Sequence, residues 1–242
     1  MEFRPLTARS VVLSTLLGSH PPRLPARYLV RVGELFGVAE GTIRVALSRM
    51  VAAGDLVQTS RGYALSDRLV HRQNRQDESR APHTRPWSGA WELVVVTADR
   101  RAAADRAALR QAMADLRLAE LREGTWLRPA NLDRPRPGVV TEQCAWFEAR
   151  PDGDPAELAA RLWDLDAWSA RAGDLSRALD PGASLADRFV VSAAVLRHLL
   201  QDPLLPDPLL PGDWPGGTLR AQYAAFQADF EHFLVRHVLE PG

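Results

Sequence analysis

The 242-residue sequence predicts an α+β fold in three domains, and three observations support this prediction. Helical patterns followed by two short β-prone runs fill the N-terminal part. The apolar, β-branched run Trp91–Thr97 opens the middle part and is typical of a buried strand. Helical patterns and a proline-rich stretch make up the rest. We therefore expect domains at residues 1–70, 87–152 and 153–242, with a linker at 71–86.

Composition and charge narrow the class of protein. Every basic side chain is arginine, and the net charge is zero. Residues 1–85 nevertheless hold 13 Arg against 7 Asp plus Glu, whereas the remainder holds 17 against 23. A basic N-terminal third on an acidic body favours a nucleic-acid-binding module, although a chance imbalance across solvated faces would give the same numbers.

Cysteine content and hydropathy predict the compartment. The single cysteine, Cys144, forbids an intramolecular disulfide and fits a reducing environment. The sequence has no apolar run of about 18 residues, as a membrane span requires. Its first ten residues lack the apolar region of a secretory signal. We expect a cytoplasmic protein with no membrane partner.

The N-terminal domain is predicted to begin with two helices. Thr7 can cap a helix over Ala8–Leu17, and Gly18 ends it. The prolines that follow cannot continue this helix, because proline has no amide N–H. A second helix begins near Pro25, where proline is tolerated in the first turn. Its apolar residues are Leu29, Val32, Leu35 and Phe36.

Residues Val38–Leu65 are predicted to form a third helix and a hairpin. Gly54 can end the helix in a left-handed conformation, and the strands Asp55–Thr59 and Tyr63–Leu65 follow it. One helix face carries a core stripe: Ile43, Ala46, Leu47 and Met50. Two helices, a turn, a third helix and a hairpin are the order of a winged helix-turn-helix. The same elements would also fit the core of another small α+β domain.

The opposite face of the third helix carries candidate DNA-binding residues. Small side chains flanked by arginines suit a helix that enters the major groove, because bulk would hold the backbone away from the bases. The arginine at the hairpin tip would contact the minor groove or a phosphate. The candidates are Thr42, Arg44, Val45, Ser48, Arg49 and Arg61.

The middle domain is predicted to be ferredoxin-like. After the first strand come an alanine-rich helix over Arg100–Leu118, either a strand pair or one bent strand around Glu123-Gly124, and a last strand over Gln143–Ala149. Three prolines and a glycine make Asn131–Val139 a loop, so we expect the second helix of this fold to be missing. The linker before this domain has almost no apolar side chains and is either a tether or a solvated segment.

The C-terminal domain is predicted to be helical. The helices cover Pro155–Ala172, a segment from Ser184 to about Gln201, and Thr218–Leu239, and Ser184 resembles the first residue of a capping box. Asp202–Gly217 contains five prolines, two Leu pairs and a tryptophan. We expect this segment to pack on the helical domain, because disorder would leave its leucines exposed.

Several motifs together identify a family resemblance. They are TIRVALSRMVAAGDL at Thr42–Leu56, WSGAW at Trp87–Trp91, TWLRP at Thr125–Pro129, WDLD at Trp163–Asp166 and HLLQDPLLPDPLLPGDWPG at His198–Gly216. With these motifs the sequence resembles the PaaX-type family, the transcriptional repressors of phenylacetic acid catabolism. The resemblance implies a homodimer on a palindromic double-stranded DNA operator. It also implies release by an aromatic acyl-CoA such as phenylacetyl-CoA.

The effector leaves an alternative open. An acyl-CoA needs positive charge near its binding site, and four arginines of the body are candidates: Arg122, Arg128, Arg188 and Arg197. All four could equally be solvated or paired with acids. A winged-helix regulator without an acyl-CoA effector is therefore the alternative reading of the sequence.

An enzyme is a further alternative with weaker support. Asp99 follows the first strand of the middle domain, where small ferredoxin-like nucleases of CRISPR systems place an acidic residue. One carboxylate is too few for metal-dependent hydrolysis, which needs several oxygen ligands. The six histidines form no metal motif, and no nucleotide-binding or hydrolase motif is present. We expect no enzymatic activity, cofactor or metal.

Overall fold

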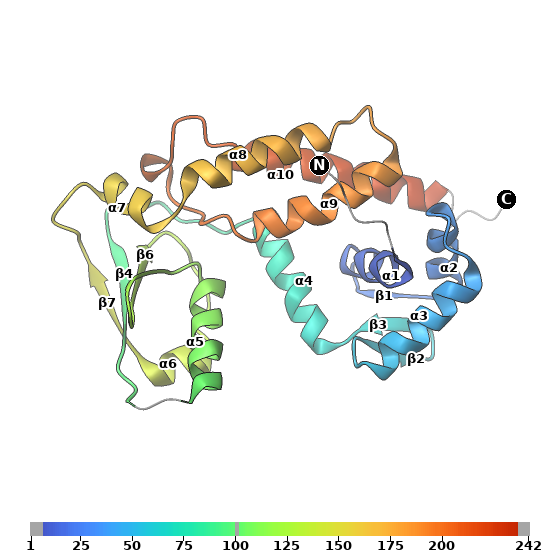
Figure 1. Cartoon of the computed structure of the whole chain (residues 1–242), viewed down its shortest axis with the longest axis horizontal. Coiled ribbons are helices and arrows are strands. Elements are labelled where there is room, and N and C mark those ends of the chain that lie inside the picture. Colours follow the sequence, from blue (N-terminus) through green and yellow to red (C-terminus); the bar gives the residue numbers. More distant parts are fainter. Residues whose placement is uncertain (1–6, 100–101, 237–242) are drawn as a thin grey trace. The chain divides into compact units, whose positions relative to one another are not determined.

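The computed structural model describes residues 7–99 and 102–236 and confirms a mixed helix-and-strand fold (Figure 1). Contacts divide the chain into two compact units. Unit 1 contains the described parts of residues 1–81, 172–200 and 216–242, and unit 2 contains those of 82–171 and 201–215. The predicted division into three domains stays a prediction.

Unit 1 begins with the predicted winged helix-turn-helix. Its elements are α1 (Ala8–Leu17), α2 (Ala26–Leu35), α3 (Glu40–Ala52), β2 (Leu56–Thr59) and β3 (Gly62–Leu65). The side chain of Thr7 accepts the Ser10 amide N–H at 3.1 Å and so caps α1 as expected. A two-residue strand that the sequence pattern did not reveal, β1 (Arg23–Leu24), pairs with β3. The sheet order is β1-β3-β2.

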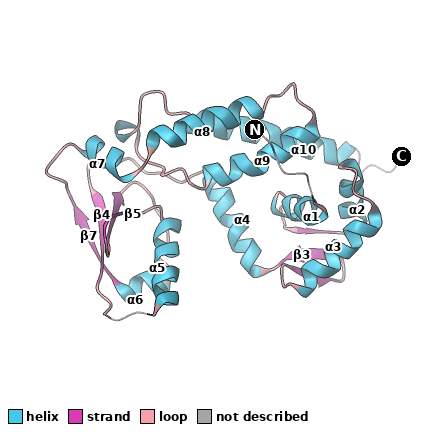
Figure 2. Ribbon diagram, viewed as in Figure 1, coloured by secondary structure: helices cyan, strands magenta, loops and turns pink. Residues whose placement is uncertain are grey.

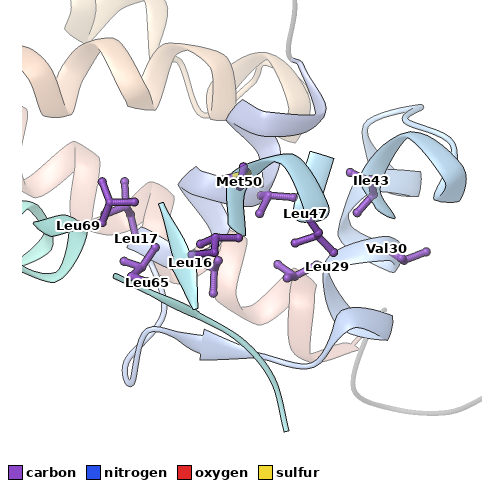
Figure 3. Packing of buried hydrophobic residues seen from close by; sticks show 11 residues of the cluster. Leu16, Leu17, Leu29, Val30, Ile43, Leu47, Met50, Leu65 and Leu69 are labelled. Carbon is purple, nitrogen blue, oxygen red and sulfur yellow. The ribbon is translucent and has the colours of Figure 1, made fainter. Parts of the chain in front are cut away.

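Side chains from the three helices form the core of this module together with Leu56, Leu65 and Leu69 (Figure 3). Ile43, Leu47 and Met50 are buried as predicted, whereas Ala46 is only partly buried. Helices α2 and α3 cross closely at Gly33. A Cβ added at Gly33 would lie only 2.5 Å from Cγ1 of Ile43. The core therefore fixes which face of α3 points outward.

The predicted linker is mostly helical. Residues 71–80 belong to α4 (Asp67–Arg80), and several of their side chains are buried, so neither a plain tether nor a fully solvated segment describes them. The assignment of 71–86 as a linker between domains stays a prediction. Most of the buried side chains of α4 are polar. The buried residues are Leu69, Gln73, Gln76 and Ser79. Gln73 Nε2 donates to the carbonyls of Leu17 and Ser19 at 2.9 Å each, which satisfies carbonyls at the end of α1. Hydrophobic periodicity cannot reveal a helix that packs through amides.

Two C-terminal helices pack in unit 1: α9 (Leu185–Leu199) and α10 (Gly216–Leu234). Ser184 caps α9 as predicted, because its Oγ accepts the Asp187 N–H at 3.1 Å. The ring centroid of Phe189 lies 4.6 Å from that of Phe36, at the end of α2. It lies 5.0 Å from the ring centroid of Phe230. Aromatic rings thus join the helix-turn-helix to both helices. The predicted helix end at 237–239 lies outside the described residues.

Unit 2 contains the ferredoxin-like domain. Its elements are β4 (Trp91–Val96), α5 (Ala103–Asp115), β5 (Ala119–Arg122), β6 (Thr125–Pro129), α6 (Gly138–Gln143) and β7 (Cys144–Ala149). The sheet is antiparallel in the order β5-β6-β4-β7, as the fold requires. The second helix, expected to be missing, is present as the short α6, which begins after Pro137. Residues 100–101 of the predicted first helix lie outside the described part.

Different parts of the chain pack on the two faces of this sheet. Helices α5 and α6 lie on one face (Figure 2), where Val94, Met113 and Val140 are buried together. Trp91 and Leu127 pack on the other face with Leu205 and Leu209 of the proline-rich segment. This segment includes the 3₁₀ turn η1 (Asp207–Leu209). It packs on this sheet and also on helical residues of the C-terminal part, because Leu158 and Leu165 share its cluster and Trp214 stacks on Trp168. Its predicted packing on helices is therefore confirmed in part.

The helix predicted over Pro155–Ala172 is interrupted. It consists of α7 (Pro155–Leu162) and α8 (Leu165–Ala178). Asp164 lies between them, and its Oδ1 accepts the Ala167 N–H at 3.0 Å. Aspartate in this position caps a new helix, which explains the break. No described helix is long and apolar enough to cross a membrane.

Candidate DNA-binding surface

The outward face of α3 carries the five candidates predicted for the reading helix. Because Ile43, Leu47 and Met50 hold α3 against the core, the opposite side chains are exposed. They are Thr42, Arg44, Val45, Ser48 and Arg49. Val45, the apolar member of this set, is 51% exposed. An apolar side chain held open between polar ones suits contact with a thymine methyl group.

Arg44 has a partner on its own helix. Its Nε donates to Oε1 of Glu40 at 2.7 Å, one turn earlier, and both side chains are more than half exposed. Sequence reasoning did not single out Glu40, although the four-residue spacing of Glu and Arg is the signal for such a pair. Glu40 places a negative charge at the start of the reading face.

The wing is the hairpin of β2 and β3. Val57 pairs with Ala64 and Thr59 with Gly62, so the tip is short and its register is defined. The Arg61 amide donates to Oγ1 of Thr59 at 3.3 Å. The Arg61 side chain is exposed at the tip, as the sequence predicts.

A buried carboxylate anchors the base of this surface. Asp55 lies between α3 and β2 and is 4% exposed. Its two oxygens accept from Arg9 Nη2 at 2.7 Å and from Arg68 Nη2 at 2.5 Å. Asp55 thereby ties α1 and α4 to the turn between the reading helix and the wing. Sequence reasoning missed this role, because the two arginines are distant in the chain.

The four ligand-binding candidates differ in their surroundings. In unit 2, Arg122 is exposed, whereas Arg128 is fully buried. In unit 1, Arg188 is buried and pairs with Asp229 at 2.8 Å, whereas Arg197 is exposed. Arg122 and Arg197 therefore have accessible charges, while the other two use theirs within the protein.

Arg128 forms a buried polar network. Its guanidinium donates to Oδ1 of Asn131 at 2.8 Å, to the Leu204 carbonyl at 3.2 Å and to the Pro129 carbonyl at 3.0 Å. Burial lowers the pKa of Arg128 well below its usual value, and the charge of Arg134 lowers it further. This side chain joins the sheet to the proline-rich segment at Leu204.

The nuclease alternative concerns Asp99 and the metal ligands that would have to accompany it. Asp99 follows β4 and is exposed. Among residues 7–99 and 102–236, no group of three or more His, Cys, Asp or Glu side chains is placed to hold a metal ion. Two-metal or one-metal hydrolysis needs such a group, so the described residues give Asp99 no support.

A winged helix-turn-helix with an exposed reading face defines a DNA-binding protein. Comparison with family models shows which family of DNA-binding proteins the chain belongs to. The PaaX-like protein model matches residues 7–69, the PaaX protein central Cas2-like domain matches 84–142, and the PaaX-like protein C-terminal domain matches 159–239. The chain belongs to the PaaX family, the transcriptional regulators of phenylacetate catabolism, which confirms the resemblance found in the sequence.

One solved structure is similar over nearly the whole chain. It is an uncharacterized protein, Rv0674, from Mycobacterium tuberculosis, with 48% sequence identity and a TM-score of 0.82. The similarity covers 96% of this chain and 98% of that chain. A search of curated proteins found no match.

Proposed function

We propose that the protein is a ligand-responsive repressor that binds a palindromic operator and is released by an aromatic acyl-CoA such as phenylacetyl-CoA. The observation that carries the DNA-binding part is the exposed face of α3 on a fully formed winged-helix core. Membership of the PaaX family supports the regulatory part.

Each candidate on the surface has a chemical role in this proposal. Arg49 and Ser48 contact base edges, and Val45 contacts a thymine methyl group. Arg44 and Thr42 contact bases or nearby phosphates at the start of α3. Arg61 at the wing tip enters the minor groove or binds a phosphate.

Two copies of the chain are needed for operator-level affinity. One small module makes few base contacts, and a two-fold dimer doubles them on half-sites about one helical turn apart. The effector then acts by population shift: it binds more tightly to a dimer whose reading helices have the wrong spacing. The regulator without an acyl-CoA effector remains the alternative.

Release of preformed complexes tests the effector. Labelled DNA selected by the protein is bound to saturation, and anisotropy is followed during addition of phenylacetyl-CoA. Free coenzyme A and phenylacetate are the matched controls, because each carries one half of the thioester. We expect release by the thioester at concentrations at which neither control acts. If no aromatic thioester releases the DNA or raises the melting temperature, the alternative without such an effector holds.

A further inference from the structure

Unit 1 contains a second concentration of positive charge, which the reading helix and wing do not include. Arg68, Arg72 and Arg75 are spaced by four and three residues, so they follow one another along one face of α4. The positive charges of Arg9 of α1 and Arg197 of α9 also act on the guanidinium of Arg72. We call these five residues the arginine cluster.

The charges of the cluster act on Arg72 together. Partial burial lowers the pKa of the Arg72 guanidinium, and the positive charges of the other four arginines lower it further, with Arg197 first among them. Since each effect disfavours the charged form, the folded protein holds these like charges together at a cost in free energy.

Acidic side chains compensate only part of the cluster. Asp55 is the carboxylate that pairs with Arg9 and Arg68. Within the described ranges, no carboxylate lies at ion-pair distance from Arg72 or Arg197, and both side chains are exposed. Asp77, on the same helix, pairs with His20 and Arg80 instead.

This arrangement has the properties of an anion site. Guanidinium groups present planar forks of N–H donors that match phosphate oxygens, often with two parallel hydrogen bonds. The ion pairs to buried Asp55 fix two members of the cluster, which reduces the entropy lost on binding. Arg72 and Arg197 then offer charges that no carboxylate of the described residues neutralises by an ion pair.

We propose that the arginine cluster is a second anion-binding site of this protein, and that it binds phosphate groups. The phosphates come either from the backbone of DNA that α3 has bound or from a small phosphorylated molecule. The DNA source rests on the proposed function, whereas the small-molecule source does not.

Single-charge variants of the whole chain test the site. Arg72→Gln and Arg197→Gln each remove one accessible charge and keep a side chain that favours helix. Arg161→Gln is the matched control, since Arg161 is an exposed helical arginine of unit 2. The first probe is inorganic pyrophosphate, compared with chloride at equal ionic strength in thermal unfolding.

Pyrophosphate is expected to raise the melting temperature of the wild type and of Arg161→Gln, but much less that of Arg72→Gln or Arg197→Gln. Without pyrophosphate, Arg72→Gln is expected to melt at the same or a higher temperature than the wild type, because it removes like-charge repulsion. A loss of fold would instead lower this temperature, so the two causes are distinguishable.

The second probe is duplex DNA. If the cluster contacts backbone phosphates, Arg72→Gln reduces the slope of log Kobs against log salt concentration by about 0.9, while Arg161→Gln leaves it unchanged. A change in the slope alone assigns the site to DNA, and a pyrophosphate response alone assigns it to a small molecule. Equal behaviour of wild type and both variants in both assays overturns the proposal. If the wild type binds no DNA, the proposed function is rejected. The pyrophosphate assay alone then shows whether the arginine cluster binds phosphate groups.

Discussion

Arg44 donates from Nε to Oε1 of Glu40 at 2.7 Å, within the first two turns of the reading helix. Both side chains are more than half exposed, and such a pair contributes only a few tenths of a kcal/mol. Arg44 can therefore leave Glu40 for a phosphate or a guanine at little cost. Glu40 keeps the guanidinium on the reading face in the free protein and competes with DNA for it.

The first prediction concerns this pair. Arg44→Ala is expected to weaken specific DNA binding by at least about 1 kcal/mol, because it removes a charged contact. Glu40→Gln is expected to tighten binding, because it removes a negative charge and the competing acceptor. Anisotropy titrations at one fixed salt concentration measure both effects, with Glu157→Gln of α7 as the charge-matched control. Unchanged affinity of Arg44→Ala would remove Arg44 from the interface.

The second prediction concerns the crossing of α2 and α3. Gly33→Ala is expected to destabilise the protein by about 1–3 kcal/mol, because the new methyl group would overlap the Ile43 side chain. Gly41→Ala is the matched control on the neighbouring helix, where an added Cβ meets nothing within 4 Å. It is expected to stabilise α3 by up to about 1 kcal/mol. Urea unfolding gives both values, and equal effects would mean that the helices do not cross this closely.

The third prediction concerns the buried network of unit 2. Arg128→Met is expected to cost about 1–3 kcal/mol, because it leaves the buried Asn131 Oδ1 without this donor, while the Leu204 carbonyl keeps the hydrogen bond from Asn131 Nδ2 at 2.9 Å. Faster amide exchange near Leu204 is expected as well, since the proline-rich segment loses its tie to β6. Arg161→Met, at an exposed position, should change neither quantity. Unaltered exchange near Leu204 would show that the apolar packing alone holds the segment.

The fourth prediction concerns alkaline pH. Burial raises the pKa of Tyr223 to about 12, against about 10 in an unfolded chain. The fold therefore favours the protonated phenol, and the resulting stabilisation is complete below about pH 10 and is lost as the pH rises from about 10 to 12. Tyr223→Phe should flatten the fall of unfolding free energy in this window. The pKa of Tyr28 is also raised, by burial and by Glu231, so some slope should remain. A variant with the wild-type slope would contradict the assignment to Tyr223.

The winged helix and the ferredoxin-like sheet were predictable because their signals are local. Ile43, Leu47 and Met50 repeat at helical spacing, and Thr7 and Ser184 carry the side chains that helix caps need. Exposure of the five α3 candidates followed from the same periodicity.

The packing of α4, the sheet contact of the proline-rich segment and the role of Asp55 depend instead on contacts between residues that are distant in the chain. Gln73 makes α4 a packed helix by bonding carbonyls more than fifty positions earlier. Leu205 packs on Trp91 and Leu127, whose strands lie far earlier in the chain. Asp55 pairs with Arg9 and Arg68, which lie 46 and 13 positions away in the chain. Sequence spacing contains no signal for such partners, because their distance along the chain is arbitrary.

The central claim is that α3 of this chain reads a palindromic DNA sequence. Selection of bound fragments from a random duplex library by the purified full-length protein tests it most directly, with Arg49→Ala selected in parallel. We predict enrichment of a two-fold motif with half-sites about one helical turn apart. We also predict that Arg49→Ala loses or relaxes the motif at matching positions of both half-sites. Failure of the wild type to enrich any motif, or the same motif at equal strength with Arg49→Ala, would contradict the claim.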